Sequence, residues 1–369
     1  MRKSAQLNPA PPDSNADSHL PAPVFHDPKH HIKIFQGDCL EILAKIPEAC
    51  VDLIFADPPY FLSNNGITCH AGRMVSVNKG DWDRSRGADA NHEFNRAWLA
   101  ACQRVLKPNG TIWVSGTSHV IHSVGFAMQQ LDFKLLNDIS WIKPNPPPNL
   151  SCRYFTHATE TIIWAAKNKK SRHAFNYKLM KETNHGKQMK SVWEVLPPGR
   201  EEKLFGKHPA QKPVALLERI ILASSNEGDL VLDPFMGSGT TLVSALRLRR
   251  GAYGCEFEFQ SLNLSLRRIC SELVQVEISV SSLQISVDLV SRSMDRSRCT
   301  QDRAARMSSQ FQLVHKELRF HFIGGTKREV IFSVLAESLD EARQKFLASG
   351  LSDSNLFFIV KTQTEIYLV

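Results

Sequence analysis

Two short segments, far apart in the chain, carry residue types that could do chemistry together. Residues 57–60 (DPPY) combine a carboxylate, a turn fixed by two prolines and an aromatic ring. Residues 233–241 (DPFMGSGTT) place a carboxylate ahead of a glycine-rich turn. The first segment is suited to holding an amino group while its nitrogen reacts, and the second to bringing backbone close to a cofactor. The pair indicates transfer of a methyl group from S-adenosylmethionine to the amino group of a base.

The amino group of a nucleobase is a poor nucleophile, because its lone pair is delocalised into the ring. The carboxylate of Asp57 and the carbonyl of Pro58 could accept its two N–H bonds and aim the lone pair at an electrophile. The same carboxylate would stabilise the positive charge that develops on the nitrogen. Tyr60 offers a ring face for a base flipped out of the duplex. An ordinary rigid turn is the alternative, but the apolar strand predicted over 51–56 delivers this segment at its end.

The glycine-rich segment follows an apolar run at residues 230–232, which predicts a strand, a glycine turn and a helix start. It lacks the GKS or GKT of a Walker loop, and Leu242 stands where the dinucleotide pattern needs a third glycine. Glu256 ends the next apolar strand, where a carboxylate could accept both ribose hydroxyls of an adenosine. Asp38, after another strand, is a candidate for the adenine edge. For both carboxylates a helix-capping or surface role is the open alternative.

From residue 32 onward, short apolar runs alternate with helical spacing. Strands are predicted over 32–35, 51–56, 111–115, 135–141, 160–165, 229–232 and 251–255, and helices over 39–46, 93–106, 120–130, 214–223 and 240–249, with a further helix to about 273. Alternation of this kind implies crossover connections between strands. The expected fold class is therefore α/β with a mostly parallel sheet.

The remaining segments divide the chain. Residues 1–31 are rich in Pro, Ser, Asn and Asp and are predicted to form a disordered tail ahead of a methyltransferase domain over 32–275. A polar, basic stretch at about 144–205 interrupts the alternation and is the expected target-recognition region. Residues 276–310 are Ser-rich and predicted to be a linker, and residues 311–369 a small α+β appendage.

The composition narrows the class of protein. A chain of 369 residues with 42% hydrophobic content can bury one large core, with room for a smaller appendage. It has no apolar run long enough to cross a membrane and no apolar signal-peptide segment behind Arg2 and Lys3. Its eight cysteines form no CxxC or Cys/His ligand spacing, so reduced thiols, no metal site and a cytoplasmic location are expected. The net charge of +8 suits a polyanionic partner but decides little alone.

The motifs resemble those of the DNA amino-methyltransferases of the β class, in which the catalytic and recognition segments precede the cofactor loop. The matching motifs, in the order typical of that class, are residues 57–60, 208–213 (HPAQKP) and 233–241. The resemblance covers about residues 32–273. It implies a Rossmann-like class I S-adenosylmethionine-dependent methyltransferase with circularly permuted motif order.

A narrower likeness is to the adenine methylases of the DpnA type. It lies in residues 61–66, 79–83 and 149–157. This likeness implies N6 methylation of adenine in GATC, an ability to act on single-stranded DNA and membership of a restriction–modification system.

Carried over residue by residue, the resemblance implies a target base held by Asp57, Pro58 and Tyr60. It implies an S-adenosylmethionine site lined by Asp38, Lys212, Asp233, Phe235, Gly237, Ser238, Gly239 and Glu256. Glu256 departs from the class pattern, in which aspartate is common, and its longer carboxylate is expected still to reach the ribose. Residues 276–369 have no recognised counterpart in the class.

A DNA methyltransferase must grip phosphates and read base edges. The candidates for DNA contact are Asn149, Arg153 and His157 in the basic stretch, and Arg73 and Lys79 in a long polar loop over 61–92. A solvated basic face is the alternative for the lysines. Trp82 could stack on a base or anchor the long loop, and the anchor is the favoured interpretation. The expected partners are double-stranded DNA, single-stranded DNA, a second copy of the chain and a cognate restriction endonuclease.

Other reactions and other classes of protein were weighed against this hypothesis. Methylation of cytosine at N4 uses the same geometry, so only the resemblance favours adenine. A catalytically silent DNA-binding regulator could keep the fold, although an intact Asp57 and glycine turn argue against it. Methylation of cytosine at C5 needs a Pro-Cys nucleophile, and the chain has no Pro-Cys. A glutamine methylase of proteins would be expected to have Asn in place of Asp57.

Overall fold

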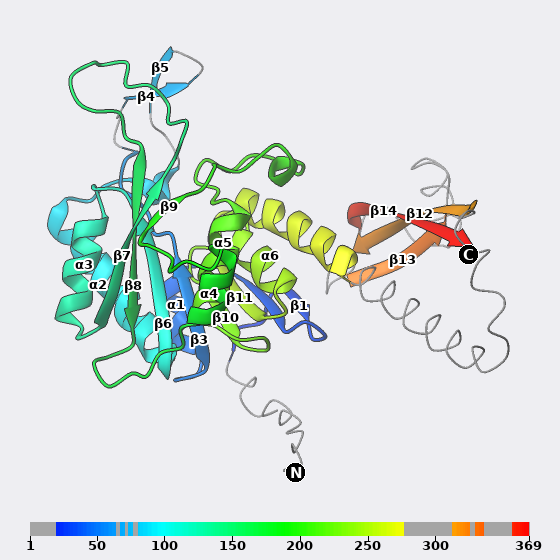
Figure 1. Ribbon diagram of the computed structural model, residues 1–369, viewed down its shortest axis with the longest axis horizontal. Coiled ribbons are helices and arrows are strands. Elements are labelled where there is room, and N and C mark those ends of the chain that lie inside the picture. The colour runs from blue at the N-terminus through cyan, green and yellow to red at the C-terminus, as the bar shows by residue number, and fades with distance from the viewer. Residues whose placement is uncertain are drawn as a thin grey trace, which may run out of the picture.

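The computed structural model describes residues 20–63, 67–70, 73–76 and 80–276, and three C-terminal strands over 312–324, 329–335 and 356–368. For those three strands, and for residues 67–70 and 73–76, the backbone alone is described. Figure 1 shows the helices gathered around one large sheet.

A sheet of nine strands forms the centre of the fold. Its strands in chain order are β1 (Phe25–Asp27), β2 (Ile32–Gln36), β3 (Val51–Ala56), β6 (Leu106–Gly116), β7 (Lys134–Ile142), β8 (Thr159–Ala166), β9 (Val192–Glu194), β10 (Leu230–Asp233) and β11 (Gly251–Glu256). In space they run β1-β2-β11-β10-β3-β6-β8-β7-β9. The five adjacent strands β2, β11, β10, β3 and β6 pair in parallel, as do β7 and β9. β1 and β8 run antiparallel to their neighbours. The predicted α/β fold with a mostly parallel sheet is confirmed.

Apolar side chains explain why the central strands are buried on both faces. β3 reads Val-Asp-Leu-Ile-Phe-Ala, and its Leu53 and Phe55 are almost fully buried. Near-continuous apolar runs are typical of parallel strands that helices cover on both sides. β10 lies directly beside β3, with Val231 opposite Leu53. The two strands therefore bring Asp57 and Asp233 to one edge of the sheet as neighbours.

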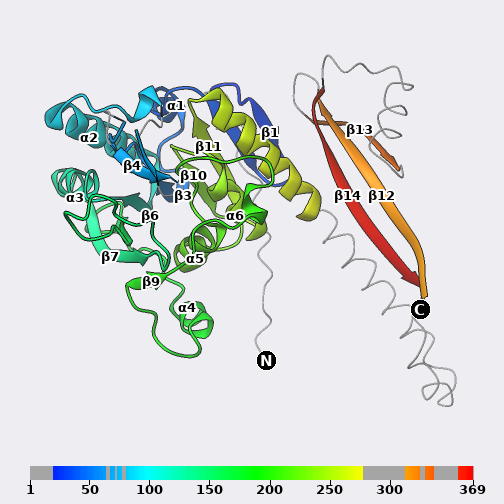
Figure 2. The same cartoon turned by 90° about the horizontal axis from the view of Figure 1, so that it is seen from above.

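Helices cover both faces of the sheet (Figures 1 and 2). They are α1 (Cys39–Lys45), α2 (Ala88–Val105), α3 (Ile121–Gln130), α4 (Tyr177–Thr183), α5 (Val214–Ser224), α6 (Thr240–Arg247) and a helix over residues 259–276, with 3-10 turns at Asp81–Asp83 and Glu201–Lys203. One apolar core joins the sheet to α1, α2 and α3, and a second joins it to α5, α6 and the helix over 259–276. The second core holds the stacked indoles of Trp113 and Trp164, with ring centroids 4.7 Å apart.

The N-terminal segment is more ordered than its composition predicts. A disordered tail is expected over residues 1–31, but β1 lies within it and pairs antiparallel with β2. The Phe25 side chain of β1 is buried in the core of the domain. The partly buried Val24 and Leu20 also pack against the domain, so a few apolar side chains and the pairing with β2 hold a segment whose composition is otherwise polar. Residues 1–19 lie outside the described part of the chain.

Helix α2 is longer than its apolar spacing predicts, and no turn separates it from β6. The helix begins at Ala88 instead of Glu93. β6 begins at Leu106, directly after the helix, because Leu106 already pairs with Val51 of β3. Residues 107–110, which separate the predicted helix over 93–106 from the predicted strand over 111–115, are therefore part of the strand.

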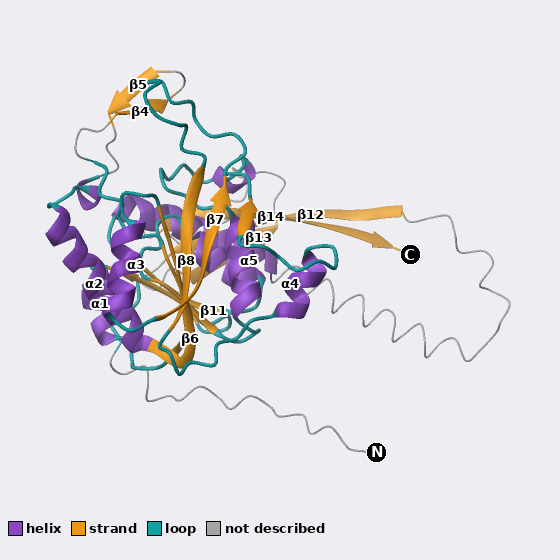
Figure 3. Cartoon of the chain, turned by 60° about the vertical axis from the view of Figure 1, so that its left-hand side comes forward, coloured by secondary structure: helices purple, strands orange, loops and turns teal. Residues whose placement is uncertain are grey.

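The loop expected over 61–92 contains a two-stranded ribbon, β4 (Ile67–His70) and β5 (Arg73–Ser76). Figure 3 shows this ribbon and the segment between β7 and β8 extending from the same end of the main sheet. That end carries the carboxyl ends of the parallel strands, because both segments follow such a strand, β3 and β7. Both therefore rise from the edge to which Asp57 and Asp233 are delivered.

The basic stretch and the C-terminal part carry elements of their own. α4, β9 and the 3-10 turn at Glu201–Lys203 lie within residues 144–205, and β9 extends the main sheet beside β7. A separate antiparallel sheet in the order β13-β12-β14 consists of β12 (Gln312–Gly324), β13 (Glu329–Leu335) and β14 (Leu356–Leu368). Residues 336–355 of the expected appendage and all but one residue of the expected linker lie outside the described residues, so the division into domains stays a prediction.

Candidate active site

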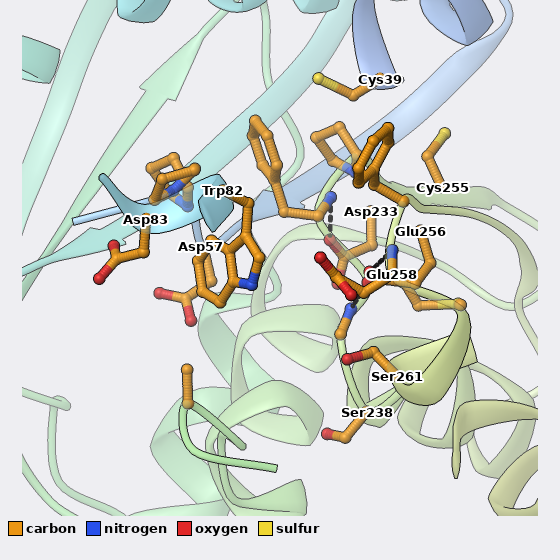
Figure 4. Close-up of a pocket in the computed structure, with 18 of the residues that line it drawn as sticks. Cys39, Asp57, Trp82, Asp83, Asp233, Ser238, Cys255, Glu256, Glu258 and Ser261 are labelled. Atoms are coloured by element: carbon orange, nitrogen blue, oxygen red, sulfur yellow. Dashed lines mark hydrogen bonds between the residues drawn. The ribbon is translucent and has the colours of Figure 1, made fainter. Parts of the chain in front are cut away.

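A cavity of about 260 Å³ lies at the carboxyl edge of the parallel strands, where β3 and β10 are neighbours. Its wall contains residues 57–60 and most of residues 233–241. Figure 4 shows Asp57 on one side of this cavity and Glu256 on the other. The two segments that the sequence singled out therefore share one site.

Asp57 follows β3 directly and is held by three hydrogen bonds. Its Oδ1 accepts from the Tyr60 hydroxyl at 2.7 Å and from the Ser115 hydroxyl at 2.6 Å. Its Oδ2 accepts from the Lys212 ammonium. An ionised carboxylate has about four lone-pair sites, so a position on Oδ2 is left for a further donor. The protein orients Asp57 and still leaves it able to accept a bond from a substrate amino group.

Two lysines and a second carboxylate surround this aspartate. Glu160 of β8 is buried, and its Oε2 accepts from the Tyr60 hydroxyl at 3.2 Å and its Oε1 from Lys143. The Lys212 ammonium lies 3.3 Å from the Tyr60 oxygen and 3.8 Å from Glu160. Burial has the largest influence on the pKa of Lys212 and acts to lower it, yet Asp57 and Glu160 raise this pKa above its usual value. Lys212 therefore stays charged, and two positive charges balance two negative ones.

Tyr60 is fixed as a hydrogen-bond donor. Burial first, and then the charges of Asp57 and Glu160, raise the pKa of its hydroxyl well above the usual value. The phenol therefore keeps its proton and donates to the carboxylates. The Lys212 ammonium lies 5.5 Å from the ring centroid, and the ring lines the cavity. Tyr60 thus presents an immobilised ring to any base that enters.

The sequence did not reveal three residues of this cluster, namely Ser115, Lys143 and Glu160. Glu160 is an acidic residue within an otherwise apolar strand, and that contrast is the signal that could have found it. Nothing around Ser115 distinguishes it in the sequence. Lys212 was assigned to the cofactor site by resemblance. It lines the shared cavity, but its ammonium donates a hydrogen bond to Asp57.

Asp233 and Glu256 form the acidic part of the cavity. Asp233 accepts hydrogen bonds from the backbone amide two residues on, at 3.0 Å, and from the Thr241 hydroxyl. Glu256 accepts from the Gly237 amide at 2.7 Å and from the amide two residues on, also at 2.7 Å. Burial is the main cause that raises the pKa of both carboxyls to about 7. The hydrogen-bond donors to both carboxyls are neutral groups, so no positive charge among them offsets the burial. A cation bound beside them would favour the ionised form and lower both pKa values.

The glycine turn has a backbone conformation that residues with a side chain rarely adopt. Gly237 and Gly239 have φ angles of 53° and 75°. A side chain at Gly239 would also meet the Cβ of Ser265 at 2.8 Å. Ser238 is buried and accepts two hydrogen bonds from Arg268, at 2.7 Å through its carbonyl and 3.0 Å through its hydroxyl. Gly237 and Ser238 line the cavity, whereas Gly239 shapes the turn from behind.

Three more residues discussed from sequence line the same cavity, namely Asp38, Phe235 and Trp82. Asp38 caps α1, because its Oδ1 accepts from the Leu40 amide at 2.8 Å. The capping alternative therefore holds for one of its oxygens. Phe235 packs edge-on against Trp98, with ring centroids 5.3 Å apart. The ring of Trp82 is part of the cavity wall (Figure 4), a position that suits either stacking on a base or anchoring the loop.

Three candidates for DNA contact have described side chains. The Asn149 side chain builds its own loop: its nitrogen donates to the Tyr154 carbonyl at 2.6 Å, and its oxygen accepts from the Ser151 amide at 3.0 Å. This use of the amide leaves less of it for reading a base edge. Arg153 and His157 are exposed on the same loop.

The other two candidates fall partly outside what is described. Arg73 belongs to β5, but its side chain and the whole of Lys79 lie outside the described residues. Within the described ranges, no group of His, Cys, Asp and Glu is arranged to hold a metal ion. No helix in the same part of the chain is long and apolar enough to cross a membrane.

The chemistry of the cavity fits S-adenosylmethionine, which when bound supplies an electrophilic methyl group on a positively charged sulfur. Asp233 and Glu256 are suited to a cationic ligand, because burial without a cation raises the pKa of both. The Gly237 backbone allows close approach. Phe235 and Phe257 provide aromatic surface in the same wall, and Phe257 is 64% exposed. A flat adenine ring could pack against such surface.

Comparison with known families decides the class of enzyme. The family model of N6/N4 methyltransferases, described as DNA methylase, matches residues 51–267. This span is more than half of the chain and contains both the Asp57 turn and the glycine turn. The chain belongs to this family of DNA methylases. It is accordingly an S-adenosylmethionine-dependent DNA methyltransferase, and the class and cofactor expected from the sequence are confirmed.

Several similar proteins carry the name Type II methyltransferase. The chain is 55% identical over 245 residues to M2.DpnII of Streptococcus pneumoniae, covering 66% of this chain and 91% of that relative. It is 49% identical over 246 residues to M2.MboI of Moraxella bovis, covering 67% and 90%. The family resemblance stated from the motifs is therefore confirmed.

Solved structures support the fold. The crystal structure of an M1.HpyAVI–SAM complex aligns with a TM-score of 0.50 and 28% identity, covering 64% of this chain and 98% of that one. The PvuII cytosine-N4 DNA methyltransferase aligns with a TM-score of 0.52 and 20% identity, covering 67% and 88%. The second likeness concerns the fold alone.

Proposed function

We propose that this DNA methyltransferase transfers its methyl group to N6 of adenine within GATC. The observation that carries the proposal is the cavity itself, where the Asp57 turn faces the acidic carboxylates and glycine turn of the cofactor site. The choice of adenine and of GATC is supported by the resemblance of residues 61–66, 79–83 and 149–157 to adenine methylases of that specificity. The similarity to Type II methyltransferases agrees with it.

In this proposal the chain prepares the amino group for attack. The unused position on Asp57 Oδ2 accepts one N–H bond of the amino group, and the Pro58 carbonyl accepts the other. The nitrogen lone pair is then aimed at the methyl carbon. As the carbon–nitrogen bond forms and the carbon–sulfur bond breaks, positive charge develops on nitrogen and Asp57 stabilises it. The nitrogen then loses one proton, which the same carboxylate can accept.

The segment between β7 and β8 is proposed to contact DNA beside the cavity. Lys143 and Glu160 pair across its base, and Glu160 also bonds Tyr60, so the loop is rooted in the catalytic cluster. On this loop Phe155 is 96% exposed, close in sequence to the exposed Arg153. An exposed ring suits insertion into the base stack, where it would fill the space that a flipped adenine leaves. Arg153 suits a phosphate or a base edge.

The finer partner assignments are also proposals. The names of the similar proteins support a Type II restriction–modification system, in which a cognate endonuclease would cut the same sequence. Single-stranded DNA is a second substrate, because its bases need no extrusion from a duplex. A homodimer and a cytoplasmic location stay predictions.

The test uses duplex oligonucleotides that differ only in the presence of GATC, with radiolabelled S-adenosylmethionine. Label should enter only the GATC duplex and should appear as N6-methyladenine after digestion. Equal labelling of both duplexes would overturn the GATC assignment, and label in N4-methylcytosine would overturn adenine. Asp57→Ala should abolish transfer while calorimetry shows cofactor binding largely intact, so a variant as active as the wild type would contradict the mechanism.

A further inference from the structure

The carboxylate of Asp83 is buried beneath the turn that follows the catalytic residues. Its side chain is 0% exposed. Its Oδ1 accepts hydrogen bonds from the amides of Tyr60 at 2.9 Å and Phe61 at 2.8 Å. Its Oδ2 accepts from the Leu62 amide at 3.3 Å and from the Ser63 hydroxyl at 2.8 Å. Four consecutive residues therefore fold around one carboxylate.

The backbone of this turn is strained at Phe61, which explains why it needs support. Phe61 has a φ of 58°, in the left-handed region that residues with a side chain rarely adopt. Such a conformation persists where the surroundings over-determine it. Asp83 meets that need, because it binds the amide of Phe61 and the amides on either side. The converging amides in turn satisfy a buried anion.

Asp83 also fixes one end of the Tyr60 residue. The Tyr60 amide donates to Asp83, and the Tyr60 hydroxyl donates to Asp57 at 2.7 Å. Between these two anchors the ring forms part of the cavity wall. A shift of the turn would displace both the ring and the hydroxyl that orients Asp57. Misplacement of a reacting group by about 1 Å can cost roughly 100-fold in rate.

We propose that Asp83 is a positioning residue for methyl transfer, acting by fixing the turn over residues 60–63 and thereby Tyr60. Its carboxylate is enclosed by that turn and influences the reacting atoms only indirectly, by holding Tyr60, whose hydroxyl orients Asp57. The proposal rests on the proposed transfer to adenine in GATC, which the wild-type protein tests in the same assay. The competing explanation is a loop-building carboxylate with no bearing on the rate.

Asp83→Asn tests this, because the variant keeps the size of the side chain but turns an N–H group toward backbone donors. With a GATC duplex, kcat should fall about 10- to 100-fold, while the Kd for S-adenosylmethionine changes by less than about threefold. The melting temperature should fall by a few degrees, about 2–4 °C for each kcal/mol lost, because buried amides lose part of their acceptor. Ser63→Ala is the matched control, because it removes one hydroxyl and leaves the three amide bonds. Its kcat should fall less than about threefold.

Phe61→Gly separates positioning from folding, because glycine adopts a positive φ without strain. If Asp83 acts through the turn, Asp83→Asn should lower kcat less in the Phe61→Gly background than in the wild type. Equal losses in both backgrounds would overturn the inference. So would an Asp83→Asn variant with wild-type kcat, or one that loses kcat, cofactor binding and thermal stability together. A wild-type protein that methylates no GATC adenine would overturn the proposed function instead.

Discussion

Raising the pH should strengthen the binding of S-adenosylmethionine through Asp233 and Glu256. Burial raises the pKa of both carboxyls to about 7 in the free protein. A group with this pKa is ionised in roughly 10% of molecules at about pH 6 and in roughly 90% at about pH 8. Because apparent affinity scales with the fraction of protein that is competent to bind, each carboxylate that must be ionised contributes roughly tenfold over this range. If both must be ionised, the gain approaches roughly 100-fold.

Calorimetric titration measures this dependence directly, and titrations in buffers of different ionisation heat count the protons that binding releases. The ligand's own amino group titrates too, so the comparison between variants carries the test. Glu256→Gln keeps the shape of the side chain but has no charge, and its Kd should vary about tenfold less between about pH 6 and about pH 8. Asp233→Asn should reduce the slope similarly. Asp229→Asn is the matched control, because burial raises the pKa of Asp229 as well, but this residue stands apart from the cavity lining.

The same two groups have the opposite effect on the free protein. Their folded-state pKa of about 7 lies above the ordinary values of 3.8 for Asp233 and 4.5 for Glu256. Their stabilising contribution is therefore present below about pH 4 and is lost as the pH rises through about 7. The melting temperature of the free wild type should fall over that interval more than that of Glu256→Gln. A Kd independent of pH, or a slope that Glu256→Gln retains in full, would refute the reasoning.

Two further variants test the catalytic cluster and the proposed DNA contact of the segment between β7 and β8. Lys212→Met leaves Asp57 and Glu160 without this ammonium, and breaking a buried pair costs about 3–5 kcal/mol, roughly 6–20 °C in melting temperature for a domain of this size. A calorimetric melting temperature of this variant within about 2 °C of the wild type would contradict the inference that Lys212 compensates the buried charges of Asp57 and Glu160. Phe155→Ala should lower methylation of duplex DNA about tenfold and of single-stranded DNA less than about twofold, because only the duplex must be unstacked. Phe126→Ala is the control, because it removes another exposed ring, 55% exposed on α3. Equal losses on duplex and single-stranded DNA in Phe155→Ala would contradict insertion of the Phe155 ring into the base stack.

The outline of the site was accessible from the sequence because local patterns determine it. An apolar run predicts a strand, and the residue that follows the run must lie at the end of that strand. Asp57, Asp233 and Glu256 were found in this way, at the ends of β3, β10 and β11. The strand bounds of β3 were predicted without error, because the run is short, continuous and apolar. Glycine spacing then indicated a turn in which Gly237 and Gly239 have positive φ.

Contacts between side chains from distant elements were not accessible in the same way. Glu160 meets Tyr60 across 100 residues of sequence, and Arg268 meets Ser238 across 30. Periodicity predicts that a position is buried, but it does not say which polar group will lie opposite it. Asp83 illustrates the limit, since it stood within a recognised motif while its partners depended on how the long loop folds back.

The two parts of the cavity differ in charge, and this difference determines which part binds the base and which part binds the cofactor. In the catalytic part, two lysines balance Asp57 and Glu160, so a neutral base meets a neutral surface. In the cofactor part, Asp233 and Glu256 receive their hydrogen bonds from neutral donors, and their raised pKa values record the unfavourable burial of charge. A cationic cofactor relieves that burial and is therefore directed to the glycine turn. Transfer of the methyl group removes the positive charge from sulfur, so the carboxylates that favour binding of the cofactor also favour departure of the neutral thioether product.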